Sequence, residues 1–438
     1  MEKLIRIFTI TAILTLLILT NVSTFYIQIA EAKIIIVPID YTSIQSAIDA
    51  AKDGDIIFVK SGVYYENLVI NKPVSLVGED PLTTIIDGGR KATVITITQG
   101  NVLVRRLTIR NGYDPDGGVS AGIYVCHANG CRIVENYITS NLRGIVLEDS
   151  SHNIIAKNEI FRNRDVGIFL AGLYHHCSEN YIYRNNLIEN GEEDMKHLFV
   201  SGICLAVIGL NGKLLGSCKL NKIFENNIQK NVYGINIIGE ESSCTNNQIF
   251  HNNFVDNIYQ TYVYGSFNIW DYGYPSGGNY WSDYTGVDYY SGPNQDQVGR
   301  DGIGDTPYRI NYDNFDRYPL MNPYGGSVKI MAIDAPSDVA LGLDVVFNVH
   351  VKYSFPPGRS YCIFIGVLGV EGQWISRNED WNTMRYEGSG DKSFSLKMRP
   401  YEGPYNYPIY AYYWNVEEGW VMSDTHDFLM TAHAYQAF

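Results

Sequence analysis

The chain has 438 residues, enough for more than one domain and for a large apolar core. A hydrophobic fraction of 45% argues against general disorder, and a formal net charge of -14 argues against a nucleic-acid partner, because no excess of Lys and Arg is present to neutralise phosphates. The 34 tyrosines and 41 glycines are typical of an all-β chain rich in turns.

The N-terminus has the pattern of an export signal. Lys3 and Arg6 give a positive start, residues 7–19 form a short apolar core, and residues 30–32 supply an Ala-x-Ala cleavage pattern. We therefore expect residues 1–32 to be a signal peptide. The mature protein is then secreted or held in the cell envelope, with no transmembrane span after signal removal. An uncleaved membrane anchor is the alternative, although the apolar run is short for a span.

A short capping helix is predicted next, over residues 41–51. Ile44, Ala47, Ile48 and Ala51 fall on one side of it, and the terminal repeat of a stacked fold needs such a cap. Strand-like runs follow at residues 55–60, 68–70, 74–77 and 84–86.

The middle of the chain repeats an asparagine at every fifth residue, as in Asn153, Asn158 and Asn163. An aliphatic or aromatic residue stands two positions after the first or second asparagine, and several copies then reach a Gly-Ile pair. We expect Asn to take left-handed backbone at corners and to hydrogen-bond to the same Asn one coil away. The other copies are Asn180, Asn185, Asn190; Asn221, Asn226, Asn231; Asn247, Asn252, Asn257; and the degenerate Cys131, Asn136, Asn141 and Asn101, Arg106, Asn111.

This repeat predicts an all-β fold, a right-handed parallel β-helix over residues 33–258. Short strands with one or two inward apolar residues cannot bury a face alone, but stacked at about 4.8 Å per coil they form a continuous apolar column. A helical solenoid is the alternative, and Asn and Gly at these intervals would break its helices.

The longest gap between middle asparagines, from Asn185 to Asn226, indicates an inserted loop. Insertions in stacked repeats usually lie on one face, often the binding face. We therefore predict a binding groove near residues 165–217. Its candidate residues are Asp165, His175, His176, Glu179, Glu192, Glu193 and Asp194.

Three of the seven cysteines, Cys177, Cys218 and Cys244, each precede a middle asparagine by eight residues. They are expected to stack in one column, either as a ladder of buried thiols or with a disulfide inside it. The triplet at residues 175–177 also offers imidazole and thiol ligands that suit copper. No Met-x-x-Met or His-rich tract accompanies it, so a surface His pair beside the cysteine column is favoured.

Residues 294–305 resemble a calcium-binding loop in spacing. Asn or Asp stands at the first, third and twelfth positions and Gly at the sixth, although Val at the fifth departs from the pattern. A less regular calcium site in the same segment and a plain Gly/Asp-rich turn are the alternatives. The predicted calcium ligands are Asp288, Asn294, Asp296, Asp301 and Asp305.

Residues 259–324 are rich in aromatic residues, Asp and Gly, and are predicted to close the end of the β-helix. Ring packing there is favoured over exposed rings that stack on sugars. Gly325 and Gly326 mark a linker, after which residues 345–353 alternate as a half-buried strand. Residues 327–438 are therefore predicted to form a β-sandwich of immunoglobulin or fibronectin type, acting as a spacer or interaction module.

Several segments outside the repeat carry a family resemblance. They are residues 42–51, 54–59, 62–67 and 76–79, and, after the repeat, residues 278–284, 301–308 and 316–321. Together with the repeat, these segments resemble the NosD-like proteins and the carbohydrate-binding and sugar-hydrolase (CASH) repeat proteins, both of the pectin-lyase-like superfamily. The resemblance covers residues 40–324. The resemblance implies the β-helix, but it does not select an activity, because that superfamily contains lyases, hydrolases, esterases and binding proteins.

The sequence lacks the catalytic signatures of pectin methylesterases and polygalacturonases. Four carboxylates, Glu148, Asp149, Asp165 and Glu179, could serve a glycosidase, but one sequence does not pair them, so the catalytic residues stay unknown. We expect a binding protein for a polysaccharide or cell-envelope glycan, with calcium as the cofactor. The alternatives are a polysaccharide lyase or glycoside hydrolase in the predicted groove, and a copper-handling accessory protein. The sequence leaves the glycan and the oligomeric state open.

Overall fold

The computed structural model describes residues 32–192, 199–207, 215–240, 243–355, 360–368, 374–380, 383–387, 389–415 and 419–433. The predicted signal peptide, apart from its last residue, lies outside the described residues. Two compact units divide the chain, residues 1–33 and 34–438, and the second contains all the elements below. Within the described residues, no helix is both long enough and apolar enough to span a bilayer.

The second unit begins with strand β1 (Ile34–Val37) and helix α2 (Ile44–Ala50). Ser43 caps this helix by accepting a hydrogen bond from the Ser46 N–H, while Ile44, Ala47 and Ile48 are buried. The predicted capping helix is therefore confirmed.

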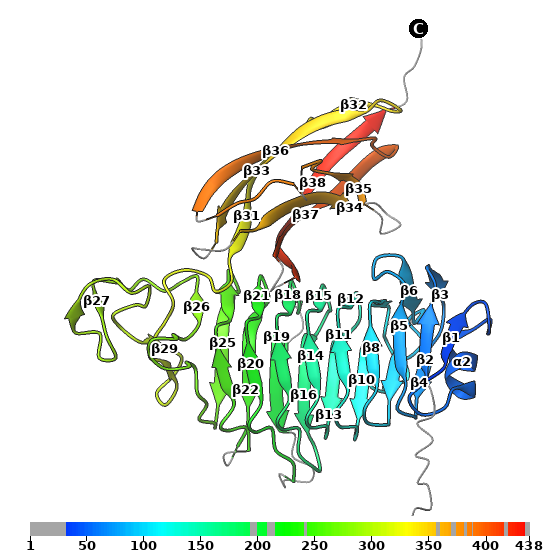
Figure 1. The fold of residues 1–438 in the computed structure, drawn as a ribbon, viewed down its shortest axis with the longest axis horizontal. Helices are drawn as coiled ribbons and strands as arrows, with labels where there is room; N and C mark the ends of the chain where they lie inside the picture. The colour runs from blue at the N-terminus through cyan, green and yellow to red at the C-terminus, as the bar shows by residue number, and fades with distance from the viewer. Residues whose placement is uncertain are drawn as a thin grey trace, which may run out of the picture. The chain divides into compact units, whose positions relative to one another are not determined.

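Three parallel sheets, named A, B and C here, form successive coils in the described part of the chain (Figure 1). In stacking order, sheet A contains β1, β2 (Ile56–Val59), β5 (Ser75–Gly78), β8 (Leu103–Arg105), β11 (Arg132–Val134), β14 (Ile154–Ala156), β17 (Tyr181–Tyr183), β20 (Lys222–Phe224) and β23 (Gln248–Phe250). Sheet B contains β3 (Gly62–Tyr64), β6 (Thr84–Asp87), β9 (Thr108–Arg110), β12 (Tyr137–Thr139), β15 (Glu159–Phe161), β18 (Asn186–Ile188), β21 (Asn227–Gln229), β24 (Asn253–Val255) and β26 (Tyr280–Trp281). Sheet C contains β4 (Leu68–Ile70), β7 (Ile95–Ile97), β10 (Ala121–Cys126), β13 (Arg143–Glu148), β16 (Val166–Gly172), β19 (Ser201–Val207), β22 (Tyr233–Ile238) and β25 (Tyr259–Tyr264).

The core of these coils is built from columns of identical or similar side chains. In sheet A, Ile133 pairs in register with Ile155, Ile155 with Ile182, and Ile182 with Ile223. All four side chains are buried, and burial of each stabilises the fold by roughly 1.5–3 kcal/mol. The predicted right-handed parallel β-helix is confirmed.

The asparagine columns are confirmed, and they begin with Asn136 and Asn141 of the degenerate second copy. The Asn158 Nδ2 donates to Asn185 Oδ1 at 2.9 Å, and the Asn185 Nδ2 donates to Asn226 Oδ1 at 3.0 Å. All three side chains are buried, so each amide also serves backbone groups that water cannot reach.

The expectation that these asparagines take left-handed backbone is wrong. The residue before each one does so instead: φ is 57° at Lys157, 55° at Arg184 and 56° at Glu225. The asparagine side chain must point inward to reach the next coil. The residue before it therefore makes the turn and leaves its own side chain outside.

The earliest predicted copy, Asn101, Arg106 and Asn111, is one residue out of frame. Strand β8 pairs with β11 so that Leu103 lies opposite Arg132, which places Leu107 opposite Asn136. The Leu107 N–H accordingly donates to Asn136 Oδ1 at 3.2 Å. Asn101, Arg106 and Asn111 occupy the left-handed corners, with φ values of 62°, 58° and 60°.

The predicted cysteine column is also present. Cys177, Cys218 and Cys244 are fully buried, and the Cys218 thiol interacts with the thiols of both neighbours. All three are free thiols, so the column is a ladder rather than a disulfide. Burial raises the pKa of the Cys218 thiol, which keeps it protonated and unreactive.

Aromatic side chains close the end of the β-helix, as predicted. Trp281 is 1% exposed and stacks on Phe254 with ring centroids 4.2 Å apart and on Tyr308 at 4.1 Å. Its Nε1 donates to Asp316 Oδ2 at 2.9 Å. The short strands of this segment are β27 (Tyr290–Ser291), β28 (Gln297–Val298), β29 (Tyr308–Arg309) and β30 (Phe315–Asp316).

Asp316 makes the stability of this end dependent on pH. Burial raises the pKa of its carboxyl from 3.8 to about 7, although N–H donors from Asn279, Trp281 and Tyr318 favour the charged form. The folded protein therefore favours the protonated acid. Ionisation of Asp316 lowers the free energy of unfolding by its full amount above pH 7, and this loss of stability disappears as the pH falls toward 3.8. We expect the melting temperature to rise by a few degrees from pH 8 to pH 5, and by less in Asp316→Asn. Calorimetry of both proteins checks this; parallel pH profiles would contradict it.

The C-terminal strands form two sheets, which confirms the predicted β-sandwich. One sheet contains β31 (Ser327–Asp334), β33 (Val345–Ser354) and β36 (Ser389–Met398). The other contains β32 (Asp338–Ala340), β38 (Gly419–His433), β37 (Gly403–Asn415), β34 (Cys362–Leu368) and β35 (Trp374–Arg377). Phe347 and Val349 of β33 and Ile363 and Ile365 of β34 are buried in one apolar cluster, which holds the sheets together.

Candidate functional site

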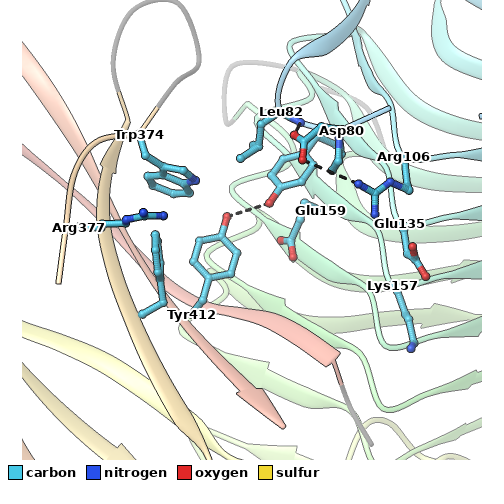
Figure 2. Close-up of a pocket in the computed structure, with 12 residues that line it drawn as sticks. Asp80, Leu82, Arg106, Glu135, Lys157, Glu159, Trp374, Arg377 and Tyr412 are labelled. Atoms are coloured by element: carbon cyan, nitrogen blue, oxygen red, sulfur yellow. Dashed lines mark hydrogen bonds and ion pairs between the residues drawn. The ribbon is translucent and has the colours of Figure 1, made fainter. Parts of the chain in front are cut away.

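A pocket of about 480 Å³ is lined by residues of the β-helix and of the β-sandwich (Figure 2). Trp374, Arg377 and Tyr412 lie on one side of it in the figure, and Arg106, Glu135 and Lys157 lie on the other. A volume of this size is in the range of pockets that hold small organic ligands.

The aromatic side of the pocket is fixed by ring contacts. The Trp374 ring meets the Phe364 ring edge-on, with centroids 5.0 Å apart, and the Tyr412 ring at 6.0 Å. The hydroxyls of Tyr137 and Tyr412 lie 3.4 Å apart. Burial raises the pKa of both tyrosines, with a further increase from the nearby Glu159, so both hydroxyls stay protonated and can donate.

The charged side of the pocket follows from the corner geometry of the coils. Arg106, Glu135 and Lys157 are left-handed residues of consecutive coils, with φ of 58°, 58° and 57°, and they form one outward row. Arg106 lies 3.8 Å from Asp80, and Glu135 accepts hydrogen bonds from Arg105 at 2.7 and 2.9 Å. These contacts orient the side chains of Arg106 and Glu135.

Glu159 provides a buried carboxylate in the same pocket. Its side chain is held by the Asn186 Nδ2, which lies 2.9 and 3.1 Å from the two carboxylate oxygens. The pocket thus combines ring faces with fixed hydrogen-bonding groups, a combination suited to polar ligands with apolar faces. Sequence reasoning did not find this pocket, because Tyr137 and Tyr412 are 275 residues apart.

The predicted groove residues fall into two groups. Asp165 directly precedes strand β16 and pairs with Arg143 at 2.9 Å. Glu192, in the next coil, lies beside the start of the same strand and pairs with Arg164 at 2.9 Å. His175, His176 and Glu179 follow the other end of β16. A strand of that length separates its ends by roughly 20 Å, so the structure does not bring the two groups together. Glu193 and Asp194 lie outside the described residues.

The predicted copper ligands at residues 175–177 do not face one another. Neighbouring side chains along an extended chain point to opposite sides, so His176 and Cys177 point away from each other. His176 Nδ1 lies 2.8 Å from Ser217 Oγ, whereas the buried Cys177 thiol donates to Leu147 O and Ser150 O inside the core. The Glu179 carboxylate lies 3.7 Å from His152.

The predicted calcium ligands mostly serve the backbone of their own loop. Asp288 accepts from the N–H groups of Asp301 and Gly302, and Asp305 accepts from those of Tyr289 and Tyr290. Asp301 accepts from the Ile303 N–H and from Gln295 Nε2. Asn294 and Asp296 are exposed. A calcium site in this loop stays a prediction.

Stacked Asn-rich coils, three parallel sheets and a capped N-terminal end define a β-helix repeat protein. The family model described as "Periplasmic copper-binding protein (NosD)" matches residues 49–197 and 207–286, just over half of the chain. The chain therefore belongs to the NosD family.

Two further similarities were found. Over 177 residues, the chain is 29% identical to "Cell surface glycoprotein" of Methanothermus fervidus (strain ATCC 43054 / DSM 2088 / JCM 10308 / V24 S). That match covers 33% of this chain and only 28% of the relative's length. The crystal structure of alginate lyase from Paenibacillus sp. str. FPU-7 matches with a TM-score of 0.28 at 14% identity, over 54% of this chain and 94% of that chain.

Proposed function

We propose that this protein works at the cell surface or in the envelope, where it binds a carbohydrate or envelope polymer in the pocket beside Trp374. The description of the family as periplasmic and the relative's name, "Cell surface glycoprotein", support the location. The observation that carries the binding role is the pocket itself, with Trp374 facing a row of charged groups.

Chemistry narrows the class of glycan. Aromatic rings pack on the apolar faces of sugars, and buried carboxylates such as Glu159 accept hydrogen bonds from hydroxyls. Acidic and basic groups are both present along the pocket, and the whole chain carries a net charge of -14. A neutral glycan therefore fits better than a polyuronate, which this negative charge would repel.

Trp374→Ala tests the pocket. Truncation of an aromatic anchor in a binding site costs about 2 kcal/mol or more, so affinity for a retained neutral glycan should fall about 30-fold. Affinity electrophoresis through gels that contain neutral or acidic polysaccharides identifies the polysaccharide that retards the protein. Calorimetry with oligosaccharides of that polysaccharide then measures the affinity. Tyr65→Ala, at a 75% exposed ring outside the pocket, is the control and should bind like the wild type.

Equal affinity of the wild type and Trp374→Ala would contradict the pocket assignment, and failure to retain any glycan would contradict the function. Product release from a retained polysaccharide would instead support the alternative of a lyase or glycoside hydrolase.

The second candidate function is copper handling, which the description of the family supports. Two results together would support copper handling. Copper should stay bound to the purified protein through gel filtration, and it should be lost when His175, His176 and Cys177 are all replaced. Retention of copper by that triple variant would contradict a role for the triplet.

A further inference from the structure

The last residues of two neighbouring strands in sheet C place a thiol beside a carboxylate. Cys126 ends β10 and Glu148 ends β13, and the two residues are partners in the parallel register. The residues before them, Val125 and Leu147, are buried in the core. Because side chains alternate along a strand, Cys126 and Glu148 both point outward.

His127 completes a compact group of potential metal ligands. Its φ of 52° is left-handed, and this corner returns the ring toward the preceding residue, so that Nδ1 lies 3.0 Å from Cys126 Sγ. Cys126 Sγ lies 4.0 Å from Glu148 Oε1. The three ligand atoms all fall within 4.8 Å of one another, and no other such group of three occurs in the part of the chain that the structure describes.

A second layer of contacts orients the histidine. Its other ring nitrogen, Nε2, lies 3.5 Å from Asp149 Oδ2. Asp149 is itself fixed by the N–H groups of Leu173 and Tyr174, at 2.8 and 3.0 Å. A carboxylate on the far nitrogen of a histidine sets the ring orientation and leaves the near nitrogen to bind a metal.

We propose that Cys126, His127 and Glu148 bind a divalent transition metal of borderline hardness, of which Zn²⁺ is the best match. Sulfur and imidazole ligands disfavour calcium and magnesium, whereas a thiolate, an imidazole and a carboxylate all suit Zn²⁺. Tetrahedral coordination at about 2.0–2.3 Å needs ligand atoms about 3.3–3.7 Å apart. The observed separations of 3.0 and 4.0 Å bracket this range. These three residues supply three of the four ligands of a tetrahedral site. This site is separate from the glycan pocket.

Metal titration of the full chain, reduced and freed of metal, tests the proposal. We expect one Zn²⁺ per chain by calorimetry, and a thiolate-to-metal charge-transfer band when Co²⁺ is the probe. Cys126→Ser should abolish the band, and His127→Asn should weaken Zn²⁺ binding about tenfold or more. Asn tolerates the left-handed backbone at position 127, so this variant keeps the corner.

His152→Asn is the matched control, because His152 is also an exposed left-handed corner residue, with φ of 59°. It should bind Zn²⁺ like the wild type. Thermal melts of all variants without metal separate loss of ligand from loss of fold. Absence of Zn²⁺ binding, equal binding by His127→Asn, or exclusive binding of Cu⁺ would each overturn the assignment.

Discussion

Asn226→Ala is expected to lower the free energy of unfolding by about 4 kcal/mol. Asn226 is fully buried, and its Oδ1 accepts from the N–H and the Nδ2 of Asn185, both at 3.0 Å. Its Nδ2 donates to Ile182 O and to Asn252 Oδ1, both at 2.9 Å. Truncation leaves these partners buried without their hydrogen bonds, at about 1–3 kcal/mol for each group that finds no substitute.

Equilibrium unfolding in urea measures this loss. The matched control is Asn71→Ala, at an exposed asparagine of the same β-helix, which should change stability by less than about 0.5 kcal/mol. If both variants unfold at the same urea concentration, the ladder does not stabilise the coils.

Trp281→Ala is expected to cost a similar amount, about 3–5 kcal/mol, through the cavity that it leaves. Trp281 stacks between Phe254 of the last complete coil and Tyr308 of the closing segment. Its loss also leaves the Asp316 carboxyl without the indole N–H donor. The closing segment should therefore detach from the coils more readily, and limited proteolysis should cut within residues 282–324 first.

Urea unfolding and proteolysis rates provide the measurements. Trp281→Phe keeps a ring in the stack and removes the indole donor, so its loss should be intermediate. Tyr312→Ala, at an 80% exposed ring in the same segment, should behave like the wild type. A Trp281→Ala protein as stable and as protease-resistant as Tyr312→Ala would show that ring stacking does not hold the end closed.

Both candidate sites depend on the same property of a β-helix. One coil brings residues more than twenty positions apart in sequence to neighbouring strands, about 4.8 Å apart. Glu135 and Lys157 become neighbours in the row at the pocket beside Trp374, and Cys126 meets Glu148 at the proposed metal site. Outward residues at the corners and strand ends are therefore free to carry function while the inward columns maintain the fold.

The sequence alone determined the fold, because its signal is periodic and local. Each Asn of the five-residue repeat, from Asn136 onward, marks one corner of one coil, and Cys177, Cys218 and Cys244 share one position relative to the middle Asn of their coils. The frame was misplaced at Asn101 because an aliphatic residue, Leu107, stands where later coils have asparagine. The five-residue spacing locates the corners only where the asparagines are present. In this coil the ladder asparagine is replaced by Leu107, so the spacing did not show that the frame was one residue off.

Tertiary structure decided the sites. The predicted groove grouped residues by nearness in sequence, but strand β16 holds Asp165 and His175 at opposite ends. The pocket needs Trp374 from a β-sandwich strand, and the proposed metal site needs the register that pairs Cys126 with Glu148. Composition and spacing specify which side chains point inward. Which outward side chains meet depends on coil length, on the direction of each corner and on the packing of a separate domain, and these are properties of the folded chain.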